Sequence, residues 1–267
     1  MAPPKVILFD IGGVCVISPM SAIASYERNH SIPPGYINTA ISSTSPNGSW
    51  QRLERGEIPL DASFFSSFQR DLRNPDLWRR YYAKSRPDVP VPPVPEIDAE
   101  GLFWTMMTVS RAPDPYIYPA LRRLRQVADE TGEFVVAACS NTSIFPPGHV
   151  FNDPSTPEGK FNAELKGSFH LFVSSAHVGM RKPERSMYEL TLRECERVAR
   201  EKGVIGKEER LNPGEVLFLD DIGGNLRGAR EVGIKGVKVV MGKTEDAVRE
   251  LERVVGVQLS GEKKARL

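Results

Sequence analysis

The sequence predicts an α/β protein with a doubly wound parallel sheet and an inserted, mostly helical module. Short apolar runs without polar interruption recur along the chain, and such runs are typical of strands covered on both faces. From residue 116 onward these runs alternate with helical periodicity, which implies right-handed crossovers in a parallel sheet. Residues 20–115 lack this alternation and hold all three tryptophans, so we interpret them as an insertion.

Length and composition are those of an ordinary soluble protein. The 267 residues suffice for one large domain or a core with a smaller insert, and 40% are hydrophobic and 26% charged. A net charge of +1 gives no overall attraction to nucleic acid or anionic lipid. No apolar run is long enough to span a membrane, and Asp10 interrupts the only candidate for a signal peptide. The three cysteines lack metal-binding spacing, so we expect free thiols in a reducing, cytoplasmic compartment.

The first predicted strand, Val6–Phe9, ends in a carboxylate. Asp10 follows it directly, and Gly12-Gly13 then let the chain bend away. Ligands of open α/β sheets bind at the carboxyl ends of the strands, so Asp10 is a candidate site residue, although Asp and Gly also begin ordinary turns. The apolar run at residues 14–17 predicts a second short strand, which would form a flap beside Asp10.

The inserted region leaves the core near residue 18 and returns near residue 115. Two proline clusters, at 87–95 and 112–115, are too stiff and too poor in donors for helix or sheet. We therefore expect a core formed by 1–18 and 116–267 and a helical cap at 19–115. Helices are predicted in the cap at Ser21–His30, Trp50–Arg55, Leu60–Asp71, Asp76–Ser85 and Asp98–Val109.

The second part of the core alternates strands with helices. Between its first strand and the next, residues 143–167 are predicted as a long loop that is functional or carries a small hairpin. The predicted strands are Phe134–Cys139, His170–Ser174, Val216–Leu219 and Gly236–Val240. The predicted helices are Pro119–Thr131, Ser186–Lys202, 223–232 and Thr244–Val255.

Polar side chains follow four of the predicted strands. These are Asp10, then Ser140 and Asn141, then Lys182, and finally Asp220, Asp221 and Asn225. In a parallel sheet such groups meet at one edge, although each alone also fits a turn or a helix start. Carboxylates without His or Cys suit Mg²⁺, and a lysine with a hydroxyl and an amide suits a small oxyanion. Asp10 faces that anion and could attack it as a nucleophile.

Four segments resemble the motifs of the haloacid dehalogenase superfamily: FDIGGV, ACSNTS, GMRKPERSMYEL and FLDDIGGNLRGAREVGIKGV. The likeness is greatest to the N-terminal phosphatase domain of soluble epoxide hydrolases and its stand-alone relatives. It implies a Rossmann-like core with a helical cap of the C1 type inserted after the first motif, which agrees with the insertion at 19–115. The segment 54–58, Glu-Arg-Gly-Glu-Ile, resembles one that such caps carry.

The resemblance also implies roles for the polar residues. Asp10 would be the nucleophile that forms an aspartyl phosphate, and Ser140, Asn141 and Lys182 would bind the phosphoryl group of a small phosphorylated substrate. Asp10, Asp220 and the Gly12 carbonyl would bind Mg²⁺ directly, Asp221 would hold it through water, and Asn225 would steady this loop. Epoxide hydrolysis is not implied, because it belongs to a separate α/β-hydrolase domain and this chain has no G-x-S-x-G elbow.

One position departs from the family pattern. Family phosphatases usually carry a second aspartate two residues after the nucleophile, where this chain has Gly12. That carboxyl group serves as acid and base, and such help is worth roughly 10²–10⁴-fold in rate. We therefore expect a slow or specialised Mg²⁺-dependent phosphatase. The alternatives are a non-catalytic binding or regulatory protein and a dehalogenase-like hydrolase, although the latter leaves Asp220 and Asp221 unexplained.

The chain ends in a small residue, a basic residue and a leucine, Ala265-Arg266-Leu267. This ending resembles the Ser-Lys-Leu address of peroxisomal proteins. It equally fits a charged tail without a targeting role. The sequence thus leaves a cytoplasmic and a peroxisomal location open.

Overall fold

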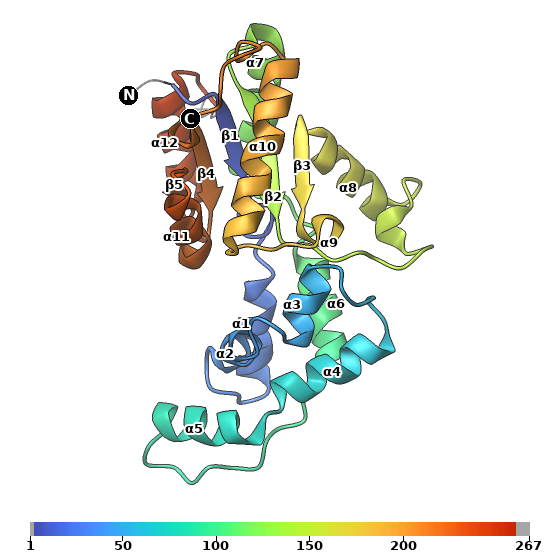
Figure 1. Cartoon of the computed structure of the whole chain (residues 1–267). Helices are drawn as coiled ribbons and strands as arrows, with labels where there is room; N and C mark the ends of the chain where they lie inside the picture. The colour runs from blue at the N-terminus through green and yellow to red at the C-terminus, as the bar shows by residue number, and fades with distance from the viewer. Residues whose placement is uncertain (1–2, 260–267) are drawn as a thin grey trace, which may run out of the picture.

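The computed structural model describes residues 3–259 and contains a parallel sheet of five strands. The strands lie in the order β3-β2-β1-β4-β5, and every neighbouring pair is parallel. The predicted doubly wound fold is thus confirmed, with the first strand in the centre of the sheet (Figure 1). The strands are β1 (Val6–Phe9), β2 (Val135–Ser140), β3 (Leu171–Ser174), β4 (Val216–Asp220) and β5 (Lys235–Lys238).

Helices cover both faces of this sheet. Alternate residues of β1 serve opposite faces, since Ile7 and Phe9 belong to one apolar cluster and Val6 and Leu8 to the other. The first cluster is closed by α7 (Ile117–Thr131) and α12 (Thr244–Val255), and the second by α10 (Arg185–Glu201) and α11 (Gly223–Glu231). All three cysteines are buried and unpaired, as predicted.

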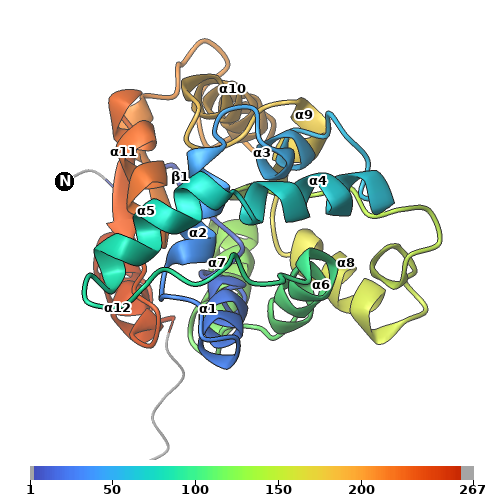
Figure 2. The same ribbon diagram turned by 90° about the horizontal axis from the view of Figure 1, so that it is seen from below.

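A helical region is inserted between β1 and β2, as in C1 caps of the haloacid dehalogenase type. It has its own apolar core, drawn entirely from buried residues between Ala22 and Met106. This separate core supports the cap boundaries at 18/19 and 115/116, which stay a proposal. The helices are α1 (Met20–Asn29), α2 (Tyr36–Ser43), α3 (Ser49–Glu54), α4 (Ala62–Leu72), α5 (Pro75–Ser85) and α6 (Ala99–Val109). Figure 2 shows the same region from below, with α3 beside the short helix α9 (Ser175–Val178).

Three helices were not predicted from the sequence, one of them the short helix α9. The helix α2 is another, and it is short and begins after Gly35 at a positive φ of 85°. Residues 143–167, predicted as a loop or hairpin, instead hold a 3₁₀ turn (Val150–Asn152) and α8 (Pro157–Gly167). The start of α8 carries ordinary signals, because Pro157 opens it and the Thr156 side chain accepts a hydrogen bond from the Gly159 N–H. The hydrophobic residues of α8 form only a weak amphipathic pattern, so helical periodicity did not indicate this helix.

The predicted short strand at residues 14–17 is wrong. The N–H groups of Val14, Cys15 and Val16 all donate to the Ile11 carbonyl, so this segment is a tight buried turn. Only isolated bridges, from Val16 to Gly12 and to Pro113, relate it to a sheet. Burial of both its sides made the run look like a strand, because periodicity does not separate a buried turn from a buried strand.

No helix within residues 3–259 is long and apolar enough to cross a membrane. The terminal signal at 265–267 lies outside the described residues.

Candidate active site

The strand ends bring a lysine and two carboxylates into contact. Asp10 follows β1, Asp220 ends β4, and Lys182 lies between β3 and α10. The Lys182 Nζ atom lies 2.8 Å from Asp10 Oδ1 and 2.8 Å from Asp220 Oδ2. All three side chains are buried, so this contact is shielded from solvent. The convergence expected for a parallel sheet is therefore present at its carboxyl edge, beneath the cap.

A third carboxylate completes an acidic cluster beside the lysine. Oxygen atoms of Asp10, Asp220 and Asp221 lie within 4.8 Å of one another. Asn225 steadies the cluster, since its Nδ2 donates to both Asp220 oxygens at 3.1 and 3.0 Å. The Asp221 Oδ1 atom is buried without a hydrogen-bond partner. Such an orphan acceptor among hard oxygen donors fits a divalent cation such as Mg²⁺, and this cluster could hold one.

The chain passes close to Asp221 because Gly13 lacks a side chain. Gly13 has a φ of +78°, and a Cβ atom there would lie 2.3 Å from Asp221 Oδ2. Gly12 is less constrained, because the nearest atom to a Cβ at that position would be the Pro19 Cδ at 3.4 Å. The two adjacent glycines therefore differ, and only the second is sterically required.

Burial and mutual repulsion dominate the electrostatics of the cluster. Burial raises the pKa of Asp10 to about 7, with the nearby Asp220 adding to the effect and the Lys182 ammonium opposing it. Burial and the charge of Asp220 raise the pKa of Asp221 to about 6. Burial alone would lower the pKa of Lys182, but the two carboxylates outweigh it and hold the pKa above its usual range. The Lys182 ammonium, with a smaller contribution from Lys238 at Asp221, thus offsets the charge of the three acidic groups only in part.

Two residues predicted to bind phosphate lie at the end of β2. Ser140 is buried and makes a long 3.4 Å contact from its Oγ to the Asn141 carbonyl. The Asn141 side chain instead clamps the backbone of Lys182, accepting from its N–H at 2.8 Å and donating to its carbonyl at 3.0 Å. This use of the amide cannot be predicted from the sequence, because it depends on a contact across 41 residues.

A cavity of about 340 Å³ adjoins this cluster. Gly12, Ser140 and Asn141 belong to its lining, and the rest comes mainly from the cap, from residues 142–166 and from residues 172–177. Most of the other lining is apolar or aromatic: Trp50, Leu53, Phe103, Met107, Phe145, Phe151, Phe161 and Phe172. Trp50, which also packs against the apolar core of the cap, and His177 both line this cavity.

Magnesium binding should strengthen as the pH increases. Asp10 and Asp221 have pKa values raised to about 7 and about 6, so below these values protons compete with the cation. We expect the affinity for Mg²⁺ to rise between about pH 5 and pH 7.5 and then to level off. Isothermal titration at several pH values measures this.

The variant Asp221→Asn should weaken Mg²⁺ binding by about 10- to 100-fold. Asp246→Asn, which changes an exposed carboxylate on α12, serves as the control. An affinity that does not vary with pH would contradict the assignment of these carboxylates as metal ligands.

Comparison with known sequences supports a family relationship. No family model matches the chain. It is 25% identical over 256 residues to the bifunctional epoxide hydrolase 2 of Sus scrofa, covering 94% of this chain and 39% of that protein. It is 26% identical over 257 residues to the acyl-CoA dehydrogenase family member 10 of Mus musculus, covering 96% of this chain and 19% of that protein. The chain thus spans less than half the length of these relatives.

Comparison with solved structures supports the same fold. A HAD-like family hydrolase from Porphyromonas gingivalis superposes with a TM-score of 0.54 at 17% identity, over 96% of this chain and all of that chain. At this identity the likeness concerns the fold, including the helical insertion after the first strand. The chain is thus similar over nearly its whole length to bifunctional epoxide hydrolase 2, and it shares the fold of a HAD-like family hydrolase.

Proposed function

We propose that the protein is a Mg²⁺-dependent phosphatase that hydrolyses a small phosphomonoester through a phosphorylated Asp10. The observation that carries this proposal is the contact of Lys182 with both Asp10 and Asp220, beside a third carboxylate. A nucleophilic carboxylate can approach a phosphate dianion only where positive charge offsets their repulsion. One ammonium and a cation-binding cluster at the same point supply that condition.

Each residue has a defined task in this reaction. An oxygen of Asp10 attacks phosphorus, the bond from phosphorus to the leaving oxygen breaks, and water then cleaves the aspartyl phosphate to release inorganic phosphate. Lys182 and Ser140 hold the phosphoryl oxygens. Asn141, at the same end of β2, is a further ligand of the phosphoryl group. Asp10, Asp220 and the Gly12 carbonyl would bind Mg²⁺, with Asp221 acting through water and Asn225 steadying Asp220. The bound ion would neutralise phosphoryl charge.

The pocket favours an apolar leaving group. Aromatic and aliphatic side chains make most of the 340 Å³ cavity that adjoins Ser140 and Asn141. Burial of an organic substituent against them would supply binding energy remote from the reacting atoms. We therefore expect aryl and other apolar phosphomonoesters to have lower KM values than glycerol phosphate.

One assay distinguishes the candidate functions. A phosphatase releases inorganic phosphate from an aryl phosphate in Mg²⁺ and stops when the ion is chelated. A dehalogenase releases chloride from a 2-haloacid without a metal; that reaction would use Asp10 as the nucleophile but would leave Asp220 and Asp221 of the acidic cluster without a role. Phosphate release that EDTA abolishes supports the proposal, and chloride release or inactivity toward all substrates contradicts it.

A carboxyl group restored at position 12 should accelerate the hydrolysis of phosphomonoesters whose leaving groups depart poorly. A side chain fits at Gly12, where a Cβ would lie 3.4 Å from the Pro19 Cδ. Alkyl phosphates need a proton on the departing oxygen, whereas aryl phosphates need it less. We expect Gly12→Asp to raise kcat for alkyl phosphates by about 10²-fold or more, and to raise kcat for aryl phosphates much less.

Gly12→Asn is the matched control, because it adds the same volume without a group that can transfer a proton at neutral pH. Steady-state rates with glycerol phosphate and 4-nitrophenyl phosphate give the comparison. An equal gain for both substrates, or no gain, would refute the view that Gly12 deprives this protein of an acid–base group.

A further inference from the structure

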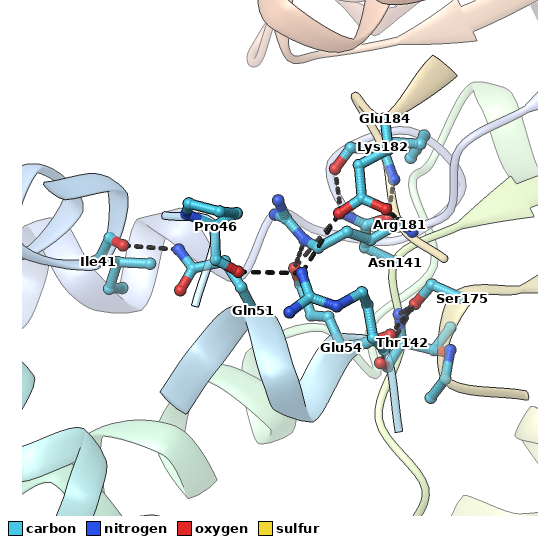
Figure 3. Close-up of polar contacts among 12 residues, drawn as sticks. Ile41, Pro46, Gln51, Glu54, Asn141, Thr142, Ser175, Arg181, Lys182 and Glu184 are labelled. Atoms are coloured by element: carbon cyan, nitrogen blue, oxygen red, sulfur yellow. Dashed lines mark hydrogen bonds and ion pairs between the residues drawn. The ribbon is translucent and has the colours of Figure 1, made fainter. Parts of the chain in front are cut away.

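The end of α3 connects the cap to the loop that carries Lys182. The Glu54 Oε2 atom lies 2.6 Å from Arg181 Nε and 3.5 Å from Asn141 Nδ2 (Figure 3). Arg181 precedes Lys182 in sequence, and Asn141 clamps the Lys182 backbone. The Glu54 and Arg181 side chains are only 12% and 16% exposed, so the pair is largely shielded from water. The Glu54 carboxylate of the cap thus contacts both Arg181, which precedes Lys182, and Asn141, which holds the Lys182 backbone.

Backbone contacts fix the same helix end against the core. The Ser175 hydroxyl donates to the Glu54 carbonyl at 2.6 Å. Gly56 has a φ of +67°, and a Cβ there would lie 2.2 Å from the Ala176 carbonyl oxygen. Arg55 adds a contact from its Nη1 to Glu184 Oε1 at 3.3 Å. The backbone at residue 56 therefore approaches Ala176 so closely that only glycine fits there. This approach places the Glu54 carboxylate beside the loop that carries Lys182.

The helix α3 is in turn tied to the body of the cap. The Gln51 side chain donates to the Ile41 carbonyl at 2.7 Å, and Arg55 donates to the Pro46 carbonyl at 3.0 Å. Figure 3 shows the contact of Gln51 with Ile41 on the cap side of α3 and the contacts of Glu54 with Asn141 and Arg181 on the core side. The backbone of α3 joins these two sets of contacts. A displacement of the cap would therefore shift Arg181 and Asn141, which hold the backbone of the loop that carries Lys182.

We propose that Glu54 is a positioning residue, whose carboxylate couples docking of the cap to the placement of the Lys182 ammonium. With the cap docked, Glu54 orients Arg181 and Asn141, and they fix the backbone from which Lys182 reaches Asp10. Without that contact the backbone hydrogen bonds from Asn141 loosen, and the ammonium no longer faces the nucleophile correctly. This role rests on the proposed function, since Lys182 is there a ligand of the phosphoryl group.

The kinetic test compares Glu54→Gln with a matched control. Glu189→Gln breaks an exposed ion pair on α10, between Arg185 and Glu189 at 2.7 Å, and should leave the rate unchanged. Glu54→Gln should lower kcat by about 10- to 100-fold, because small misplacements of catalytic groups cost rates of that order. The loss should be equal for aryl and alkyl phosphates, since a positioning residue does not sense the leaving group. A loss confined to alkyl phosphates would overturn the proposal, because it would make Glu54 a proton-transfer residue.

A second readout needs no activity. The Lys182 N–H is hydrogen-bonded to Asn141 Oδ1 at 2.8 Å, so its hydrogen–deuterium exchange reports on the clamp. Glu54→Gln and Gly56→Ala should both accelerate exchange in the peptide that contains Lys182, whereas Glu189→Gln should not. Unchanged exchange in both variants would overturn the coupling. If the wild-type protein releases no phosphate, the proposed function fails, and this measurement still decides the coupling.

A double variant separates the loss of positioning from a loss of stability. Glu54→Gln alone leaves the largely buried Arg181 guanidinium without its counter-charge, which can destabilise the chain for reasons unrelated to Lys182. Glu54→Gln with Arg181→Met removes both charges together. We expect this double variant to keep its thermal unfolding temperature and to show the same fall in kcat and the same faster exchange. A stable double variant with the wild-type rate would overturn the proposal.

Discussion

Replacing Asp10 with Asn should abolish phosphate release, with a fall in kcat on the order of 10⁵-fold or more. The amide cannot attack phosphorus, and loss of the nucleophile removes the covalent route altogether. Acid-quenched wild-type protein should carry a phosphoryl group on the peptide that contains Asp10, detected by mass spectrometry. The same peptide of Asp10→Asn should carry none.

The Asn variant should remain folded, which makes the result interpretable. The pKa of Asp10 is raised to about 7, so its charged form destabilises the folded state and wild-type stability falls as the pH climbs from about 4 to about 7. Metal-free Asp10→Asn should therefore unfold at a higher temperature than the wild type at pH 8, with a smaller difference at pH 5. Asp76→Asn, an exposed change on α5, is the control. Retained phosphate release by Asp10→Asn would exclude Asp10 as the nucleophile.

Replacing Lys182 with Met should remove activity and weaken the fold. The ammonium is 1% exposed and contacts Asp10 and Asp220 at 2.8 Å each. Its loss should lower kcat by about 10²- to 10³-fold, as expected for removing one group that stabilises developing anionic charge. It also leaves two buried carboxylates without their cation, which costs about 3–5 kcal/mol of unfolding free energy when they are ionised.

The stability loss of Lys182→Met should depend on pH in a defined direction. Lys182 lowers the pKa of Asp10, so its removal raises that pKa further and the carboxyl group stays protonated to a higher pH. Since a carboxyl with a raised pKa destabilises the fold as the pH rises, the deficit should be larger at pH 8 than at pH 5. Thermal unfolding in EDTA measures it, and Mg²⁺ should restore part of the loss. Lys84→Met on α5 is the exposed control. Equal stability of Lys182→Met and wild type at both pH values would contradict the charge balance described for this site.

Much of the core could be predicted from sequence because its signals are local. The run Val6–Phe9 is completely buried, as its uniform composition indicated, and its end at Asp10 is the edge where Lys182 and Asp220 also lie. Parallel pairing makes this inference possible, because it places the carboxyl ends of separate strands side by side whatever the intervening chain does. The acidic cluster thus followed from strand ends alone.

Other features could not be predicted, because they depend on which surfaces meet. A buried apolar pattern looks the same in the turn at residues 14–17 as in a strand, and the same in Trp50 of the cavity wall as in a core residue. The side chain of Asn141 also clamps the backbone of Lys182, and this contact across 41 residues could not be predicted from the sequence. Composition indicates that a side chain is buried without indicating its neighbour.

The sequence by itself determined the five strands of the sheet and most of the helices between them, the insertion of a cap, and the edge of the sheet where chemistry is expected. These properties depend on spacing along the chain and on the geometry of parallel sheets. Only the tertiary structure decided that Glu54 of the cap reaches Arg181, 127 residues away, and that aromatic residues from two segments enclose one cavity. Contacts between distant segments depend on how the cap docks, and no local pattern encodes that docking.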